Sequence, residues 1–270
     1  MVVQHNLTAM NANRQLGITT GLQAKSTEKL SSGYRINRAA DDAAGLSISE
    51  KMRSQIRGLN KASSNAQDGV SLIQTAEGAL NEAHAILQRM NELATQAAND
   101  TNTDVDREAI NKEMQALTSE MDRIASTTQF NSMNLLDGTF TGKNLQVGAL
   151  EGQTIGISIG AMNATTLQIT GLSVATNADA GSAMTSIQNA IDTVSTQRSA
   201  LGAIQNRLEH TIANLDTTAE NTQAAESRIR DVDMAEEMVQ YSKNNILAQA
   251  GQSMLAQANQ ATQGVLSLLQ

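Results

Sequence analysis

Between Ile48 and Ala97 the sequence carries an apolar or small residue at every third or fourth position without a break. Such spacing marks one face of an α-helix, and a face that continues for about seven heptads is typical of a coiled coil. The chain contains no proline, which favours long uninterrupted helices. The stripe consists of Ile48, Met52, Ile56, Leu59, Ala62, Ala66, Val70, Ile73, Ala76, Leu80, Ala83, Leu87, Met90, Ala94 and Ala97.

Three further segments show the same spacing. One runs from Thr103 to Ile124, after a polar and turn-forming stretch. Another runs from about Ala183 to Met238. A final segment, from Leu247 to Leu268, carries Met254 and Val265 among its apolar positions. Because steps of three and four residues dominate throughout, we expect all three segments to be helical.

The centre of the chain, from Gln129 to Ala180, changes to a period of two. Apolar residues alternate with polar ones, and the pairs Asp137-Gly138 and Glu151-Gly152 are typical of turns. We therefore expect a mostly α fold, with long coiled-coil helices from both termini and a small central β-hairpin region of one or two hairpins. The alternating residues are Leu145, Val147, Ala149, Ile155, Ile157, Ile159, Leu167 and Ile169.

Composition and motifs argue against catalysis and nucleic-acid binding. A net charge of −8 disfavours a nucleic-acid binder, and the absence of cysteine excludes disulfides and thiolate metal sites. The three histidines are dispersed, and Glu209-His210 lacks the second histidine of a zinc-protease motif. We interpret Asp41-Asp42 as a helix start rather than a metal or acid pair. The sequence predicts no catalytic residue, no cofactor and no metal site.

The two ends of the chain have an unusual polarity. Residues 244–270 carry no charge, yet nine of these 27 residues are Asn or Gln. A solvated helix face normally carries Lys and Glu, whereas a membrane helix would not carry so many amides. Burial inside a protein assembly fits both features.

The charges of the two ends are also complementary. Residues 1–40 hold five basic side chains and one acidic one, whereas residues 231–270 hold one basic and four acidic side chains. Opposite charge favours the two ends lying side by side, although exposed ion pairs add only about 0–1 kcal/mol each. We expect the burial of Leu, Met and Ala stripes to provide most of the pairing energy.

The residues alone indicate no secretory signal and no membrane insertion. The N-terminus lacks a basic region followed by a long apolar run, and no stretch approaches the roughly 18 apolar residues of a membrane span. On these grounds alone the predicted location is cytoplasmic.

Several segments resemble bacterial flagellins. The run from Lys29 to Ile48, KLSSGYRINRAADDAAGLSI, is similar to the N-terminal signature of that family, as is the segment from Ala66 to Leu80. Near the other end, Leu201–Leu208, Ala225–Ala235 and Gln257–Gln260 resemble the family as well. The resemblance covers about residues 1–140 and 183–270. It is highly specific, because the family's motifs occur near both ends of the chain and in the family's order.

The resemblance implies a short-form filament subunit for motility, with three parts. Residues 1–44 plus 233–270 would form a terminal coiled-coil domain inside the filament. Residues 45–140 plus 180–232 would form a helical rod domain, and residues 141–179 a reduced variable region with the β-hairpin. The candidate assembly residues are Leu7, Leu16, Leu22, Leu247, Met254, Val265 and Leu268.

The same resemblance implies partners and a location. The partners would be further copies of the chain in a homopolymer, a flagellar export chaperone bound to the final helix, and the filament cap and hook-junction proteins. Export through the flagellar type III apparatus needs no cleaved signal. This changes the expected location from cytoplasmic to secreted, in the extracellular bacterial flagellum.

Recognition by Toll-like receptor 5, a vertebrate innate immune receptor, is a further implication. The matching positions are Gln88, Arg89 and Leu93 on one helix and Glu113 on the next. Arg89 and Leu93 lie four residues apart and would share a helix face. Without the resemblance, Arg89 would be interpreted as an ordinary solvated charge.

Two alternatives to a filament subunit stay open. A hook–filament junction protein shares the early motif, although the C-terminal similarity argues against it. A soluble binding module, such as a secreted coiled-coil adhesin or immune ligand, is the alternative from a different class. Polymerisation induced by salt or seeds distinguishes them, because a module would stay monomeric.

Overall fold

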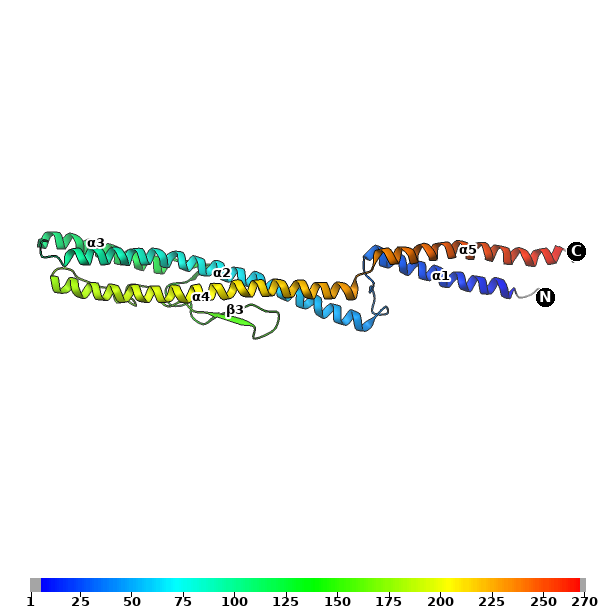
Figure 1. Ribbon diagram of the computed structural model, residues 1–270, viewed down its shortest axis with the longest axis horizontal. Coiled ribbons are helices and arrows are strands. Elements are labelled where there is room, and N and C mark those ends of the chain that lie inside the picture. Colours follow the sequence, from blue (N-terminus) through cyan, green and yellow to red (C-terminus); the bar gives the residue numbers. More distant parts are fainter. Residues whose placement is uncertain (1–5, 268–270) are drawn as a thin grey trace. The chain divides into compact units, whose positions relative to one another are not determined.

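The computed structural model describes residues 6–267, with side chains up to Gln260, and is dominated by five α-helices (Figure 1). The helices are α1 (Leu7–Ser32), α2 (Ala43–Ala97), α3 (Asp104–Thr127), α4 (Asn177–Arg230) and α5 (Met234–Ser267). At about 1.5 Å per residue, the 55 residues of α2 span roughly 80 Å. The expected mostly α fold with long helices and a small central hairpin is confirmed.

The chain divides into two compact units. The terminal unit contains the residues up to Ile56 and those from Glu220 on, and the helical unit contains Arg57–Ala219. These bounds lie further into α2 and α4 than the expected bounds at residues 44 and 233. The expected division into three parts stays a prediction.

The core of the helical unit is a continuous seam between α2 and α4. Eleven of the fifteen stripe positions read from the sequence are buried, from Leu59 to Ala97. The two helices run antiparallel, because Ser63 Oγ donates to Asp216 Oδ1 at 2.8 Å while Arg198 pairs with Glu77 at 3.6 Å. These polar pairs cross a seam that is otherwise apolar, where they favour one register of the two helices.

Helix α3 packs beside α2 and starts with a strong local signal. Thr103 and Asp106 form a reciprocal capping box at its N-terminus, which satisfies backbone N–H groups that the helix itself leaves unpaired. The hydrogen bonds from Thr103 hold the pKa of Asp106 below its ordinary value. Arg107 then donates to the carbonyl of Ala97 at 3.2 Å, which joins the start of α3 to the end of α2.

Two small antiparallel sheets form the central region. Strands β1 (Gln129–Phe130) and β2 (Met133–Asn134) make one, and β3 (Lys143–Gln146) and β4 (Thr154–Ile157) make the other. The alternation at Leu167 and Ile169 does not form a strand. There the backbone makes a compact turn, with Ile169 N donating to Ala164 O at 3.0 Å and Gln168 at φ 57°. Both apolar side chains are nevertheless buried. A turn can therefore give the same alternation of apolar and polar residues as a strand.

The β3–β4 hairpin lies against α2. Asn65 Nδ2 donates to Gln146 O at 3.2 Å, and Ala149 joins the apolar cluster of Leu59 and Ala62. Gly58 permits this approach, since a Cβ there would lie 2.8 Å from the Cβ of Ala149. The glycine therefore serves close packing rather than flexibility.

The predicted helix from Ala183 to Met238 is interrupted. Helix α4 ends at Arg230, and α5 begins at Met234. Asp233 causes the restart, because its Oδ1 accepts from the backbone N–H groups of Ala235 at 2.9 Å and Glu236 at 3.2 Å. In the terminal unit, α5 lies along α1 (Figure 1). Within residues 6–267, no helix is both long and apolar enough to cross a membrane.

Replacing Leu87 with Ala tests the core of the helical unit. Leu87 is fully buried, so we expect the free energy of unfolding to fall by about 2–5 kcal/mol from lost burial and the cavity left behind. Urea unfolding followed by far-UV circular dichroism measures it. Val105→Ala is the control, because Val105 is 75% exposed and its loss should change stability by less than about 0.5 kcal/mol. Equal effects of the two substitutions would contradict the assigned core.

Candidate interaction surfaces

The least exposed positions of α1 and α5 recur every three or four residues, as expected for two helices that meet along a seam. Most of these residues are small or polar, and Ser26 and Asn244 are among the most buried. Small side chains let the helices approach closely but bury little apolar area. We call these positions the terminal seam: Ala9, Ala12, Leu16, Thr19, Gln23, Ser26 and Leu30 of α1, with Tyr241, Asn244, Ala248, Gly251, Leu255 and Ala258 of α5.

Contacts along the terminal seam fix an antiparallel arrangement. Asn6 Nδ2 donates to Ala258 O at 2.9 Å at one end, and Lys29 pairs with Glu237 at 3.3 Å at the other. Between them, a Cβ on Gly251 would lie 3.8 Å from the Cβ of Leu16. The prediction that the oppositely charged ends lie side by side is thereby confirmed for α1 and α5.

Most of the large apolar residues of these helices lie outside the terminal seam, exposed to solvent. Their exposed fractions range from 47% at Leu247 to 71% at Leu7. An ordinary coiled coil places such residues inside its seam, so this pair shows the reverse arrangement. We call these exposed side chains together the outer apolar face: Leu7, Met10, Ile18 and Leu22 of α1, with Met234, Met238, Val239, Ile246, Leu247 and Met254 of α5.

The candidate assembly residues therefore separate into groups. Leu16 belongs to the terminal seam, whereas Leu7, Leu22, Leu247 and Met254 belong to the outer apolar face. Leu268 and the side chain of Val265 lie outside the described part of the chain. The expectation that the Leu and Met stripes hold the two ends together is wrong for Leu247 and Met254, because the residues one position further along α5, Ala248 and Leu255, take the seam instead.

Part of the outer apolar face is hollowed. A groove of about 390 Å³ on α5 is lined by Met238, Val239, Ser242, Lys243 and Ile246. Four of these residues lie at helical spacing of three or four, so the groove follows one side of the helix.

The candidate receptor residues lie on α2 and α3. Arg89 bridges the two helices, with Nε and Nη2 both 3.0 Å from Glu113 Oε1, and it also donates to Glu92 at 3.2 Å. These hydrogen bonds, first with Glu113 and then with Glu92, raise the pKa of Arg89 above its ordinary value. Gln88 is exposed beside His84, with 3.0 Å between their side-chain nitrogens.

Leu93 differs from the other candidate receptor residues. It is 2% exposed and belongs to the core of the helical unit. The two residues lie four positions apart on α2, yet Leu93 is buried while Arg89 is half exposed, and the receptor role of these residues stays a prediction. Gln88, Arg89 and Glu113 remain accessible.

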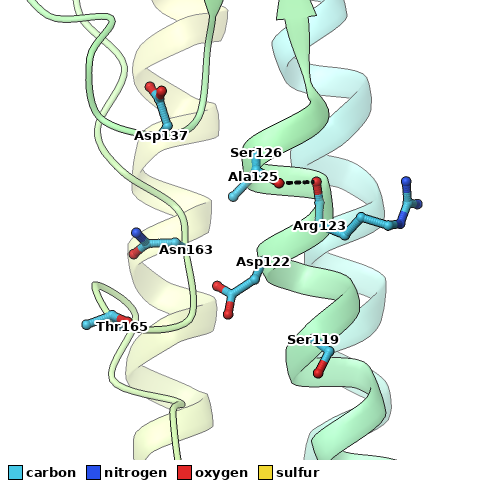
Figure 2. A pocket seen from close by; sticks show the side chains of 8 residues that line it. All are labelled: Ser119, Asp122, Arg123, Ala125, Ser126, Asp137, Asn163 and Thr165. Atoms are coloured by element: carbon cyan, nitrogen blue, oxygen red, sulfur yellow. Dashed lines mark hydrogen bonds between the residues drawn. The ribbon is translucent and has the colours of Figure 1, made fainter.

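A polar pocket of about 520 Å³ lies between α3 and the central loop (Figure 2). Asp122 points from α3 toward the loop that carries Asn163 and Thr165, and its Oδ1 accepts from Ala164 N at 2.8 Å. Asp137 accepts from Thr139 N at 2.9 Å and Asn163 from Thr166 N at 2.9 Å. These oxygens hold loop backbone in place, which accounts for the polarity of the pocket.

The remaining titratable candidates also have structural roles. Asp42 Oδ1 accepts from Gly45 N at 2.8 Å at the start of α2, which supports the helix-start interpretation. Backbone N–H groups of Arg38 and Asn37 hold the pKa of Asp41 below its ordinary value. In the part of the chain that is described, no group of three or more His, Asp or Glu side chains is arranged to hold a metal ion.

Comparison with known proteins agrees with this architecture. Residues 3–141 match the model of the bacterial flagellin N-terminal helical region, and residues 184–269 match that of the C-terminal helical region. A flagellin of Halalkalibacterium halodurans is 56% identical over the whole of both chains. The flagellar filament 31.3 kDa core protein of Treponema maltophilum is 52% identical, again over both full chains.

A solved structure supports the same assignment. The crystal structure of Bacillus cereus flagellin is 33% identical, with a TM-score of 0.51 over 60% of this chain and 94% of that one. The matched regions contain the long helices of both units and leave out the short segment of the hairpin and central loop between residues 141 and 184. The chain belongs to the bacterial flagellin family.

Proposed function

We propose that this chain is the structural subunit of a bacterial flagellar filament that serves motility, and that it polymerises with copies of itself. Flagellins are structural filament proteins and not enzymes. The observation that carries the proposal is the outer apolar face of α1 and α5. Isolated apolar residues are common on surfaces, but ten large ones exposed on two paired helices indicate a surface that a partner covers.

A second copy of the chain is the partner that fits this face. Every copy offers the same apolar side chains, and α5 beyond Asn244 has no charge whose burial would cost energy. Covering one large apolar side chain contributes about 1.5–3 kcal/mol, so several such contacts suffice for association. Contacts that repeat from copy to copy without closing generate an open helix, which is a filament.

Polymerisation of the purified chain tests this function. We expect salt or seed fragments to produce long helical filaments, visible by electron microscopy. A chain that stays monomeric in sedimentation under all these conditions would instead support a secreted binding module. Short assemblies that never elongate would favour a junction protein.

The further partners belong to the same proposal. Family members form the extracellular flagellar filament. The outer apolar face of a free subunit would be exposed to solvent before assembly. This supports the binding of an export chaperone to α5, and with it secretion through the type III export apparatus. The cap and hook-junction proteins would meet the ends of the growing filament. Co-purification of the chain with its chaperone, lost when α5 is removed, tests the first of these contacts.

Recognition by Toll-like receptor 5 is also proposed, through Gln88, Arg89 and Glu113, with Leu93 supporting the helix from inside. We expect Arg89→Ala to weaken receptor binding about tenfold or more, because it removes an exposed arginine and leaves Glu113 unpaired. Surface plasmon resonance measures the affinity. Arg123→Ala is the matched control, since Arg123 is also exposed and pairs with a glutamate on its own helix. Unchanged binding by the Arg89 variant would end this assignment.

A further inference from the structure

The two connectors of the terminal unit are joined by a small backbone clamp. One connector follows α1 and the other separates α4 from α5. Val232 N donates to Gly33 O at 3.1 Å, Arg35 N donates to Arg230 O at 2.6 Å, and Tyr34 faces Asp231 in an antiparallel bridge. We call this set of six residues the connector clip: Gly33, Tyr34, Arg35, Arg230, Asp231 and Val232.

Side chains from both connectors also stabilise the connector clip. The guanidinium group of Arg35 donates to the carbonyl of Ile229, so it reaches across to the end of α4. The guanidinium group of Arg230 lies 4.6 Å from the centre of the Tyr34 ring, a cation–π contact in the opposite direction. Main chain and side chains of both connectors therefore act together.

The clip is attached directly to the two helices of the terminal seam. Helix α1 ends at Ser32, and Gly33 caps it in a left-handed conformation with its N–H on Lys29 O at 2.8 Å. Helix α5 begins at Met234, two residues beyond Val232, and Asp233 between them caps it. Each residue turns a helix by about 100°, so a clamp held this close to both helix ends determines which side of each helix faces the other.

The choice of side matters because each helix offers two faces. The terminal seam brings mostly small and polar residues together, while the outer apolar face keeps the large ones in solvent. Hydrophobic burial alone favours the opposite choice, at about 25 cal/mol per Å² of apolar area. A contact outside the seam that fixes both helix ends would favour the observed orientation over the more hydrophobic one.

We propose that the connector clip sets the rotational orientation of α1 and α5, so that their large apolar side chains face outward for a second copy instead of being buried within the subunit. This inference rests on the proposed function for its purpose. The orientation itself is a property of the single subunit and can be measured without polymerisation. The clip thus acts as a conformational device that keeps the assembly surface available.

Disulfide trapping in this cysteine-free chain reports the orientation. The inward pair is Leu16→Cys with Gly251→Cys, whose Cβ positions 3.8 Å apart suit a disulfide. The outward pair is Ile18→Cys with Ile246→Cys, at a similar level of the antiparallel pair but 53% and 66% exposed. In dilute monomer we expect the inward pair to oxidise readily and the outward pair to stay reduced.

Val232→Pro then breaks the clip, because proline has no N–H to donate to Gly33. Val232→Ala is the matched control, since it keeps that N–H. We expect the proline variant to lower the ratio of inward to outward disulfide by about threefold to tenfold, the range that one lost hydrogen bond allows. Far-UV circular dichroism establishes that both variants keep their helices.

A second variant covers the case in which the proline unfolds the terminal unit. Arg35→Ala removes the donation to Ile229 O and leaves the backbone intact, with Arg14→Ala as its control. An unchanged ratio in helical clip variants would overturn the proposal and assign the orientation to the seam. If the wild-type chain fails to polymerise while the clip variants change the ratio, the proposed function falls and the clip stands.

Discussion

We expect a chain that lacks residues 244–270 to remain a soluble monomer under conditions in which the full chain forms filaments. The deletion removes most of the α5 side of the terminal seam and three members of the outer apolar face, Ile246, Leu247 and Met254. Helix α1 then loses most of its partner, and a largely unpaired helix of 26 residues with small and polar seam positions is marginal in water. Assembly contacts on both helices are lost together.

Charge cannot explain the expected loss, because the deleted residues carry none. The net charge stays at −8, so repulsion between copies is unchanged. The helical unit, Arg57–Ala219, contains none of the deleted residues, and its thermal unfolding should match that of the full chain. Sedimentation and electron microscopy provide the readout. Filaments from the truncated chain would show that assembly uses another surface.

The helical unit was largely predictable from sequence because burial there follows a single period. Apolar spacing from Leu59 to Ala97 placed the core of α2 correctly, and the helix predicted from Thr103 to Ile124 matches α3 at Asp104–Thr127. Leu72 and Leu93 were exceptions, because both are buried although neither belongs to the predicted stripe. A stripe defines the centre of a buried face but not its width.

The terminal unit was less predictable because α1 and α5 each have two candidate faces. The most hydrophobic positions, such as Leu247 and Met254, define the outer apolar face, while the seam uses residues such as Ala248 and Gly251. A sequence pattern identifies the most hydrophobic face of a helix as the buried one. That prediction fails where the most hydrophobic face stays exposed in the subunit and binds another molecule. The break before Met234 was missed for a similar reason, because the helical spacing continues through it.

Ile246→Glu should raise the concentration needed for polymerisation by more than about a hundredfold. Ile246 is 66% exposed and lines the groove on α5, so its substitution removes about 1.5–3 kcal/mol of burial per contact with a second copy. Placing a carboxylate in that contact adds a desolvation cost of several kcal/mol unless it is paired. Each 1.4 kcal/mol corresponds to a factor of ten, so the two losses together exceed a hundredfold.

The isolated subunit should tolerate this substitution, because exposed positions outside the core contribute little to stability. In the monomer the new carboxylate would remain in water, three residues from Lys243, where an ion pair of that spacing is neutral or slightly favourable. Gln240→Glu is the matched control, since it adds the same charge to an exposed polar position of α5 outside the uncharged stretch 244–270. We expect the control to polymerise almost normally and Ile246→Glu to keep wild-type helicity without filaments. Normal assembly of both variants would mean that a second copy does not cover the outer apolar face at Ile246, and the case for self-assembly through that surface would then fail.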